Sequence, residues 1–377
     1  MEIQPLASWG VGEQPLIIAG PCSAESEDQI MDVARVLKAT GRVNLFRSGI
    51  WKPRSRPGTF VGEGDKALVW LKRVKEETGL PVTVEVASPA HVEAALKYDI
   101  DVLWLGARTV SNPFSVDEIM RSLAGTDIPV MIKNPLSPDI ELWIGAVERL
   151  YSAGLKRLAG VLRGFTPYGK SGYRNIPKWE LAIELRRRIP SLPVFCDPSH
   201  MTGKSSLVPL EAQRALDMNM AGLMIEVHCD PSSALSDKEQ QLNPYEFSEL
   251  LRNLVFRKSS SDDTGYLSHI EELRDQIDSI DYQIIDLIAQ RMKVSEKMGE
   301  YKWLSNVTVF QLERWIKILN TRLDRAEEEG LDRSFMEDVL QAIHEESIRR
   351  QTEVMVSYAP EEPFKARITD MTSERIM

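Results

Sequence analysis

Eight short apolar runs in the first 257 residues constrain the fold of this chain more than any other feature. They lie at 16–19, 44–46, 82–84, 102–105, 130–132, 159–162, 194–196 and 223–225, and the segments between them have helical patterns. Eight strands that alternate with helices predict an α/β fold, a (β/α)8 TIM barrel. All strands of such a barrel end at one face, so residues far apart in the sequence are expected to converge on one pocket.

Residues suited to catalysis or metal binding follow these runs. They are Gly20-Pro21-Cys22, Arg47, Glu85, Arg108, Lys133, Arg163, Asp197-Pro198-Ser199-His200 and Glu226. A thiolate, an imidazole and two carboxylates suit a divalent Mn, Fe, Co or Zn ion better than Ca or Mg. The candidate ligands for one such ion are Cys22, His200, Glu226 and Asp237. Taken singly, Cys22 is explained as buried filler and Asp237 as a helix N-cap; their shared location at strand ends favours a metal site.

Positive side chains are in excess at the same face. They are Arg47, Lys52, Arg54, Arg56, Arg108, Lys133 and Arg163. A buried cation is costly unless it is paired, so this excess predicts anionic ligands. A structural network with Glu85, Asp197 and Glu226 is the alternative. The most specific element is Lys52-Pro53-Arg54-Ser55, where a stiff loop offers donors suited to a phosphate or a carboxylate.

Composition excludes several other classes of function. The formal net charge of −10 argues against nucleic acid or an anionic membrane surface as a partner. No segment approaches the roughly 20 apolar residues that span a bilayer, and no secretory signal is recognisable. The three cysteines are therefore expected to be free thiols in a reducing cytoplasm.

The composition changes at residues 258–265, which have the character of a flexible linker. We expect a barrel domain at 1–257, a helical domain at 266–356 and a loosely held tail at 357–377. From 267 to about 303, apolar residues recur at a 3–4 spacing, which predicts a helix about 55 Å long. Two shorter helices are expected at about 309–329 and 333–355. Because so long a helix cannot bury its apolar stripe within one small domain, we predict an all-α three-helix domain that dimerises with intertwined helices.

Charged residues interrupt the apolar seam of the long helix. Arg291 falls on the seam itself, where a charge is either a register device or a ligand-binding group. Lys302 lies about 20° away around the helix, so both point into one space. Arg274 lies roughly 25 Å back along the axis and can reach that space only from an antiparallel partner helix. Ser347 and Gln351 sit one turn apart on the third helix. The alternative is that these charges simply form a solvent-exposed face of the helix. This alternative explains Arg274 well, but it explains Arg291 badly because Arg291 falls on the apolar seam.

The barrel motifs resemble those of type I 3-deoxy-D-arabino-heptulosonate 7-phosphate (DAHP) synthase, in the subgroup that includes bare barrels. They are Gly20-Pro21-Cys22-Ser23, Lys52-Pro53-Arg54-Ser55, Gly106-Ala107-Arg108, Leu162-Arg163-Gly164 and Cys196-Asp197-Pro198-Ser199-His200. The resemblance covers residues 15–257. It implies a metal-dependent condensation of phosphoenolpyruvate with erythrose 4-phosphate. A related barrel that uses arabinose 5-phosphate is the nearest alternative, but it typically lacks the Lys-Pro-Arg element.

The resemblance also implies a role for each matching residue. The metal ligands would be Cys22, His200, Glu226 and Asp237. Arg108, Lys133 and Arg163 would bind the phosphate of phosphoenolpyruvate, and Arg47 and Lys52 would lie near its carboxylate. Arg54 and Ser55 would bind the sugar phosphate. Lys52 is the expected proton donor to the new hydroxyl. The stretch Arg56-Pro57-Gly58 departs from the family pattern, because relatives commonly carry a different, aromatic-bearing stretch after the Lys-Pro-Arg-Ser element.

Residues 267–355 resemble the all-helical, intertwined homodimeric chorismate mutase, whose opening motif is close to residues 273–281. The matching positions are Arg274, Arg291, Lys302, Arg314, Ser347 and Gln351. The resemblance implies that Arg291 and Arg274 of the partner subunit bind the two carboxylates of chorismate. Lys302 and Gln351 would donate to its ether oxygen. Gln311 and Trp315 stand where relatives often carry an aspartate and a glutamate that contacts the substrate hydroxyl.

These observations predict a bifunctional enzyme that makes DAHP and converts chorismate to prephenate. The alternative keeps the synthase and makes the helical part a non-catalytic regulatory or dimerisation module. Lys302 and Gln351 favour catalysis, because a sensor does not need donors to an ether oxygen. A third alternative is an unrelated metal-dependent aldolase with a coiled-coil tail. Only about fifteen residues precede the first strand, so we expect any prephenate feedback to act through the helical domain.

Overall fold

A computed structural model describes residues 1–12, 14–53, 58–169, 171–258 and 260–358. The chain divides into two compact units, Met1–Ser259 and Ser260–Met377. The first contains the strands and the second contains only helices in its described part.

The first unit is a closed barrel of eight parallel strands in sequential order, and each strand pairs with the next. The predicted barrel is confirmed, and each strand differs from its predicted range by at most two residues at either end. The strands are β1 (Leu16–Gly20), β2 (Leu45–Arg47), β3 (Val82–Val86), β4 (Val102–Leu105), β5 (Val130–Lys133), β6 (Leu158–Leu162), β7 (Val194–Cys196) and β8 (Gly222–Glu226).

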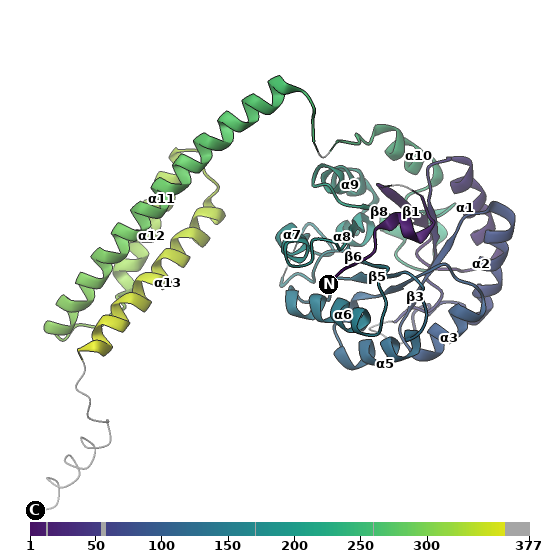
Figure 1. The fold of residues 1–377 in the computed structure, drawn as a ribbon, viewed down its shortest axis with the longest axis horizontal. Coiled ribbons are helices and arrows are strands. Elements are labelled where there is room, and N and C mark those ends of the chain that lie inside the picture. The colour runs from purple at the N-terminus through teal and green to yellow at the C-terminus, as the bar shows by residue number, and fades with distance from the viewer. Residues whose placement is uncertain (13, 54–57, 170, 259, 359–377) are drawn as a thin grey trace, which may run out of the picture. The chain divides into compact units, whose positions relative to one another are not determined.

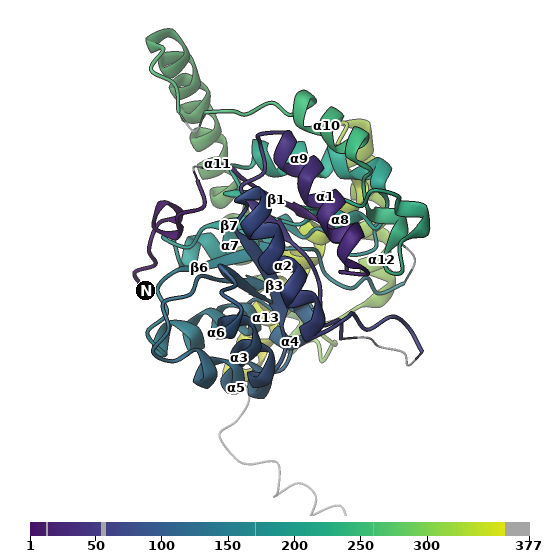
Figure 2. The ribbon, with the colours of Figure 1, turned by 90° about the vertical axis from the view of Figure 1, so that its right-hand side faces the viewer.

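A ring of helices surrounds these strands (Figures 1 and 2). Several begin at side chains that cap the free backbone amides; Ser26, for example, accepts from the Gln29 amide, and Asn243 forms a capping box with Glu246. The longer helices are α1 (Glu27–Ala39), α2 (Asp65–Thr78), α3 (Pro89–Lys97), α5 (Pro113–Leu123), α6 (Ile140–Ser152), α7 (Trp179–Arg188), α9 (Val208–Asp217) and α10 (Pro244–Asn253). The shorter ones are α4 (Ala107–Val110), α8 (Pro198–Thr202), η1 (Leu6–Trp9), η2 (Ser205–Leu207), η3 (Pro231–Ser233) and η4 (Lys238–Gln240).

The barrel has two apolar layers because strand side chains alternate between its two faces. Residues such as Ile17 and Leu103 face outward and pack in the larger cluster with the helices. Residues such as Ile18 and Trp104 face inward and form the smaller cluster. Leu6 and Trp9 of η1 belong to this inner cluster, so the N-terminal segment closes the end of the barrel at which the strands begin. The other end is left for the site.

The second unit is a three-helix assembly, as predicted, made of α11 (Thr264–Leu304), α12 (Leu312–Glu328) and α13 (Arg333–Ser357). Helix α11 extends beyond the other two at its N-terminal end (Figure 1). Only three of its residues are buried: Met292, Ser295 and Gly299. Most of its apolar stripe is exposed, including Ile277 at 57% and Leu287 at 63%. This unit alone therefore leaves the long helix without a packing partner over much of its length.

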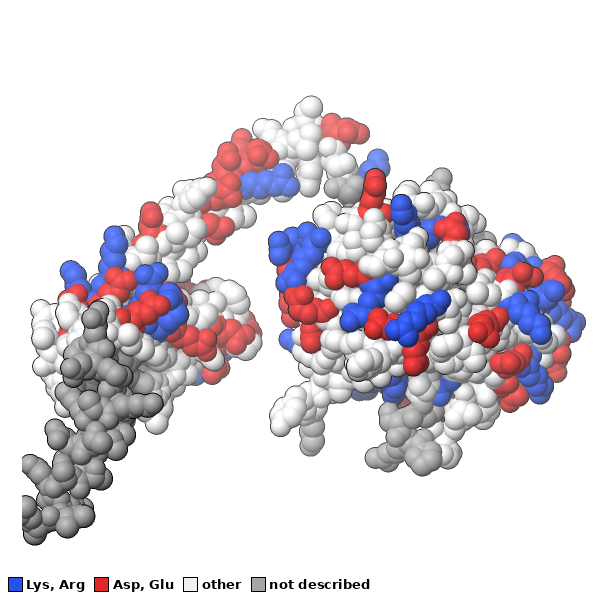
Figure 3. All heavy atoms as spheres, turned by 60° about the horizontal axis from the view of Figure 1, so that its bottom comes forward, with Lys and Arg blue, Asp and Glu red and all other residues white. Residues whose placement is uncertain are grey.

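Four further features bear on the predictions. Helix α11 begins at Thr264, inside the stretch 258–265 that the sequence suggested as a linker, because Asp263 caps its first amides. Residues 359–377 of the predicted tail lie outside the described residues. Among the described helices none is both long and apolar enough to cross a membrane. Lysines and arginines are interspersed with acidic residues over the face shown in Figure 3.

Candidate active sites

The alternation of the barrel strands carries charged residues into the mouth of the barrel. Leu45, Met131, Phe195 and Met224 face the inner core. The residues two positions further along point the same way at the strand ends. These are Arg47, Lys133, Asp197 and Glu226, and all four are buried. The predicted convergence at one face is thus a direct result of strand geometry.

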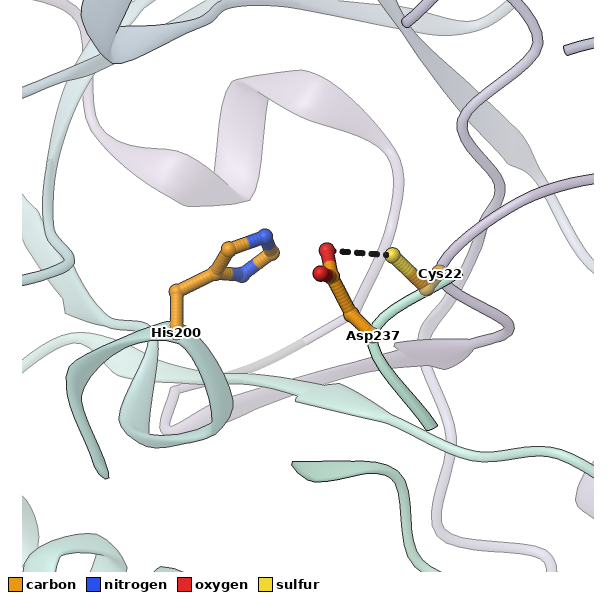
Figure 4. Close-up of side chains that lie close together, drawn as sticks. All are labelled: Cys22, His200 and Asp237. Carbon is orange, nitrogen blue, oxygen red and sulfur yellow. Dashed lines mark hydrogen bonds between the residues drawn. The ribbon is translucent and has the colours of Figure 1, made fainter. Parts of the chain in front are cut away.

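Three of the four predicted metal ligands lie together. One sulfur, nitrogen or oxygen atom each from Cys22, His200 and Asp237 lies within 4.8 Å of the others. Cys22 Sγ donates to Asp237 Oδ2 at 3.2 Å (Figure 4). Asp237 has a left-handed backbone conformation and makes no side-chain capping bond to η4. Its carboxylate is directed to the site instead, so the N-cap explanation does not apply.

Glu226, the fourth predicted ligand, lies beside this group. Its Oε1 is 3.6 Å from His200 Nε2 and 3.2 Å from Arg47 Nη1, and its Oε2 accepts from Gln240 Nε2 at 2.7 Å. Although Oε1 is buried, it has no hydrogen-bond partner. A buried carboxylate oxygen in this state is one that a cation would satisfy. The donor set therefore fits a borderline divalent metal, with Glu226 placed to complete it.

The protonation of the cluster follows from its burial and its charges. Burial, followed by the Glu226 carboxylate, raises the pKa of the Cys22 thiol to about 12, against the opposing effect of Lys52. Lys52 Nζ lies 2.5 Å from Cys22 Sγ. Burial lowers the pKa of His200, which favours the neutral imidazole that binds metals. Burial opposes ionisation of Asp237, but Arg174 and His200 hold its pKa well below its usual range.

Asp197 holds two of the predicted site residues in place. Its Oδ2 lies 2.7 Å from Lys133 Nζ and 2.8 Å from His200 Nδ1, and its Oδ1 caps α8 by accepting from the His200 amide. A carboxylate on the far ring nitrogen leaves His200 Nε2 for a ligand. Asp197 directly follows β7 and was noted for that position, but no role at the site was predicted for it.

Two of the buried cations at the barrel mouth lie over the ring of Trp104. Trp104 lies under the Arg47 guanidinium at 5.0 Å and under Lys133 Nζ at 5.8 Å. Burial lowers the pKa of Arg163 to about 10; Asp197 opposes this shift, while Arg174 and Arg108 add to it. Cations that lower each other's pKa form a region that an anion would stabilise.

Two side chains that were not predicted, Arg174 and Gln240, also lie at the mouth of the barrel. The predicted sugar-phosphate residues Arg54 and Ser55 lie outside the described residues, as does Arg56. Arg174 Nη1 contacts Asp237 Oδ1 at 3.0 Å and donates to Gln240 Oε1 at 2.5 Å. Both side chains line a cavity of about 480 Å³. Arg174 comes from a loop and Gln240 from η4, and neither directly follows a strand, so the strand-end pattern did not identify them.

The helical unit brings four of its predicted site residues together between α11 and α13. Arg291 donates to Ser347 Oγ, and Lys302 Nζ donates to Gln351 Oε1 at 2.9 Å. Gln351 Nε2 in turn donates to the Ser347 carbonyl at 3.1 Å. Gly299 permits this, since a Cβ at that position would lie 3.0 Å from the Gln351 backbone.

Two other predicted residues of the helical unit lie apart from this group. Arg274 is exposed and pairs with Glu271 of its own helix at 3.3 Å. Arg314 is exposed on the first turn of α12. Because Arg274 lies seventeen residues before Arg291 on one straight helix, the two cannot share a pocket within one chain.

A parallel eight-stranded barrel whose strand ends carry cations and candidate metal ligands defines a TIM-barrel enzyme for anionic substrates. The chain belongs to the DAHP synthetase I family, whose family profile matches residues 3–259. Residues 273–352 match a second family, chorismate mutase type II. The family resemblances, the fold class and the enzyme classes predicted from the sequence are thereby confirmed.

Individual relatives agree with the barrel assignment. A phospho-2-dehydro-3-deoxyheptonate aldolase of Thermotoga maritima is 29% identical over 63% of this chain and 68% of its own length. The crystal structure of the DAHP synthase from that organism matches with a TM-score of 0.57 at 30% identity, over 63% of this chain and 67% of the other. A 2-dehydro-3-deoxyphosphooctonate aldolase of Albidiferax ferrireducens is 30% identical over 70% of this chain and 98% of its own length.

The two families together define a bifunctional enzyme of aromatic biosynthesis, with a transferase activity in the barrel and an isomerase activity in the helical unit. They imply phosphoenolpyruvate, erythrose 4-phosphate and chorismate as substrates. The synthase family is generally metal-dependent, and the Cys22, His200 and Asp237 cluster is a possible site for that metal.

Proposed function

We propose that residues 1–257 condense phosphoenolpyruvate with erythrose 4-phosphate and that residues 266–356 rearrange chorismate to prephenate. Residues 258–265 would link the two domains, and 357–377 would form a tail. The observation that carries the synthase assignment is the convergence of Cys22, His200 and Asp237 with buried cations at the strand ends. This combination suits a phosphorylated carboxylate beside a polarised aldehyde.

In the barrel, each group has a task that follows from its place. Cys22, His200, Glu226 and Asp237 would hold a divalent Mn, Fe, Co or Zn ion, which when bound supplies Lewis-acid polarisation of the aldehyde. Arg163, Lys133 and Arg108 would bind the phosphate of phosphoenolpyruvate. The crowding of cations around Arg163 supports this, because an anion would relieve it.

Lys52 and Arg47 would lie near the carboxylate of phosphoenolpyruvate, and Lys52 would also donate the proton of the new hydroxyl. Lys52 Nζ donates to the Cys22 carbonyl at 3.0 Å, which holds the ammonium group at the edge of the metal cluster. From there it would give its proton to the alkoxide that forms when the new C–C bond is made. Arg54 and Ser55 would bind the phosphate of the sugar.

In the helical unit the reaction needs no nucleophile, because chorismate rearranges within itself. The protein has only to hold the reactive conformation and to stabilise the charge that develops on the ether oxygen. Lys302 and Gln351 would donate to that oxygen. Arg291, with Arg274 of the partner subunit, would bind the two carboxylates. Ser347 and Arg314 would contribute further substrate contacts.

A homodimer through the helical units, or a higher oligomer built on it, is part of this proposal. The exposed stripe on α11 includes Ile277, Ile280, Ile284 and Leu287, each at least 48% exposed. Four large apolar side chains on successive turns call for a covering surface. A second copy of α11 would cover them and would also deliver Arg274. We also propose a cytoplasmic location, consistent with three free cysteines.

Assays with the two candidate sugars test the synthase. The relatives include an octonate as well as a heptonate enzyme, and a product of eight carbons requires a five-carbon sugar. We expect phosphoenolpyruvate consumption with erythrose 4-phosphate to exceed that with arabinose 5-phosphate by at least about a hundredfold in kcat/KM. The reverse order would replace the proposed substrate, and no consumption with either sugar would exclude the synthase.

Loss of chorismate tests the helical unit. Conversion to prephenate supports the mutase, whereas binding without conversion supports the non-catalytic module. We further propose that prephenate bound in the helical unit slows the synthase. Its test is the synthase rate together with small-angle scattering, each measured with and without prephenate. An unchanged rate and an unchanged scattering profile would exclude the feedback.

A further inference from the structure

The helical site contains one imidazole to which the proposed reaction assigns no role. His344 lies three residues before Ser347 and seven before Gln351 on α13. That spacing places all three on one face of the helix. His344 is half-buried, and its Nε2 is buried without a hydrogen-bond partner. Buried polar atoms normally find partners, so an atom in this state within a binding site suggests that a ligand supplies one.

Aromatic residues from outside α13 fix the orientation of this ring. Trp315 of α12 stacks on His344, with ring centroids 3.9 Å apart and planes within 8°. Phe310 lies 6.0 Å away at a tilt of 56°. A stacked imidazole cannot turn freely, so the direction in which it presents its nitrogens is set before a ligand arrives. Trp315 itself can only donate through its indole N–H and cannot accept from a hydroxyl.

The surroundings of His344 also set its charge. Burial is the largest cause that lowers the pKa of His344 below its usual value. The nearby cations Arg291 and Lys302 lower the pKa further, and the carboxylate of Glu345 opposes them. A neutral imidazole has one donor and one acceptor nitrogen. It therefore suits a hydroxyl, while Arg291 and Lys302 suit the charged oxygens of the same molecule.

We infer that His344, held against Trp315, is a substrate-binding residue of the mutase site that hydrogen-bonds the ring hydroxyl of chorismate through Nε2. The inference rests on the proposed mutase function. Chorismate has two carboxylates and an ether oxygen for the cationic groups, and its hydroxyl is the polar group left over. The role belongs to His344 because its free nitrogen lies on the same face as Ser347 and Gln351.

A comparison of two substrates tests this assignment in the full chain. The substrates are chorismate and an analogue whose ring hydroxyl is replaced by hydrogen. The variants are His344→Leu, which removes the hydrogen bond, and His344→Gln, whose amide both donates and accepts. Gln341→Leu, an exposed position on α13 that bonds only Glu345 among the described contacts, is the matched control. Circular dichroism and the thermal midpoint report whether each variant folds.

We expect His344→Leu to lower kcat/KM for chorismate about tenfold, the effect of losing one hydrogen bond to a buried group, with little change for the analogue. His344→Gln should keep most of the activity, and Gln341→Leu should match the parent on both substrates. An equal loss on both substrates would show a structural role only, and no loss on chorismate would overturn the assignment outright.

Failure of the mutase function itself gives a different pattern. If the parent binds chorismate but does not convert it, the same comparison is made on Kd from calorimetry, and the hydroxyl-dependent loss is still expected for His344→Leu. If the parent neither binds nor converts chorismate while it still consumes phosphoenolpyruvate, the mutase function and this inference both fail. An analogue that binds the parent as tightly as chorismate would overturn the inference alone.

Discussion

At the scale of single residues, burial determines how the barrel cluster behaves. Cys22 and His200 are held in uncharged form by the loss of solvent, whereas Asp237 and Glu226 are kept ionised by neighbouring cations. A divalent cation that enters this cluster therefore meets two anions, one imidazole and a thiol that still carries its proton. Binding of a metal through sulfur would therefore require this thiol to lose its proton.

The first prediction concerns Cys22 itself. Cys22→Ala should abolish detectable binding of the divalent metal and lower synthase activity by at least about a hundredfold, because one of few ligands is lost. Mutase activity of the same protein should be unchanged. Metal content by mass spectrometry and the two assays check this. Cys229→Ser, at an exposed thiol, is the control. Full metal content in the alanine variant would contradict the assignment of the sulfur as a ligand.

The second prediction is a pH dependence. The pKa of the Cys22 thiol is about 12, so the thiol is protonated throughout the neutral range and must lose one proton when a metal binds. His200 has a lowered pKa and Asp237 a pKa well below its usual range, so neither exchanges a proton near neutrality. The association constant should therefore rise about tenfold per pH unit between roughly pH 7 and 9. Chelator competition measures it, and a flat profile would mean that the thiol stays protonated.

At the scale of elements, the contacts between neighbouring strands or helices determine which side chains each of them can place in a site. A β-strand needs only its two-residue period to aim Lys133 or Glu226 into the mouth of the barrel. A helix pair needs close approach as well. Helices α11 and α13 meet at Gly299 and Gln351, where backbone lies against backbone. Lys302 reaches Gln351 only because that approach is possible.

The third prediction follows from this contact. Gly299→Val should place methyl groups against the Gln351 backbone and push the two helices apart, at a cost of about 1–3 kcal/mol in the stability of the helical unit. Mutase activity should fall at least about tenfold because Lys302 and Gln351 separate, while synthase activity remains. Thermal unfolding and the two assays measure this. Lys297→Ala, at an exposed position on the same helix, is the control and should change neither the stability nor the mutase activity. Normal mutase activity in the valine variant would show that the close approach of α11 and α13 is not needed.

At the scale of the whole molecule, the helical unit is incomplete as one copy. Its long helix exposes an apolar stripe, and Arg274 lies too far from Arg291 to serve the same pocket. In the proposed homodimer, a second copy would supply what is missing in both respects. In the barrel, in contrast, the candidate metal ligands and the buried cations all come from one chain. Dilution should therefore affect the mutase before the synthase.

The fourth prediction uses this division of residues between copies. Arg274→Ala and Arg291→Ala should each be inactive as mutases when pure. After they are mixed and allowed to exchange subunits, heterodimers should contain one site with both arginines, so about one quarter of all sites should regain activity. Chorismate conversion measured against mixing time gives the result, and a mixture of the parent with itself is the control. No recovery, although native mass spectrometry shows heterodimers, would place both arginines in the same chain's site.

Much of this protein was accessible from its sequence, for reasons that differ between the two units. The barrel strands were predicted to within two residues, because short apolar runs separated by helical patterns leave little choice of fold. The candidate ligands Cys22 and His200, which lie close together, were predicted because they come within a few residues of the ends of β1 and β7. Arg174 and Gln240 were not found, since they come from a loop and from the short helix η4, whose positions depend on the packed barrel. His344 was missed because stacking on Trp315 of another helix cannot be read from spacing.

What the sequence determined by itself is therefore the order of the elements and the side chains that stand at their ends, because local periodicity encodes both. The tertiary structure alone decided which of those side chains meet. It turned Asp237 away from its helix toward Cys22, paired Glu226 with Arg47, and left one nitrogen of His344 without a partner. Such contacts join residues from distant segments, and they depend on packing in three dimensions that no local pattern contains.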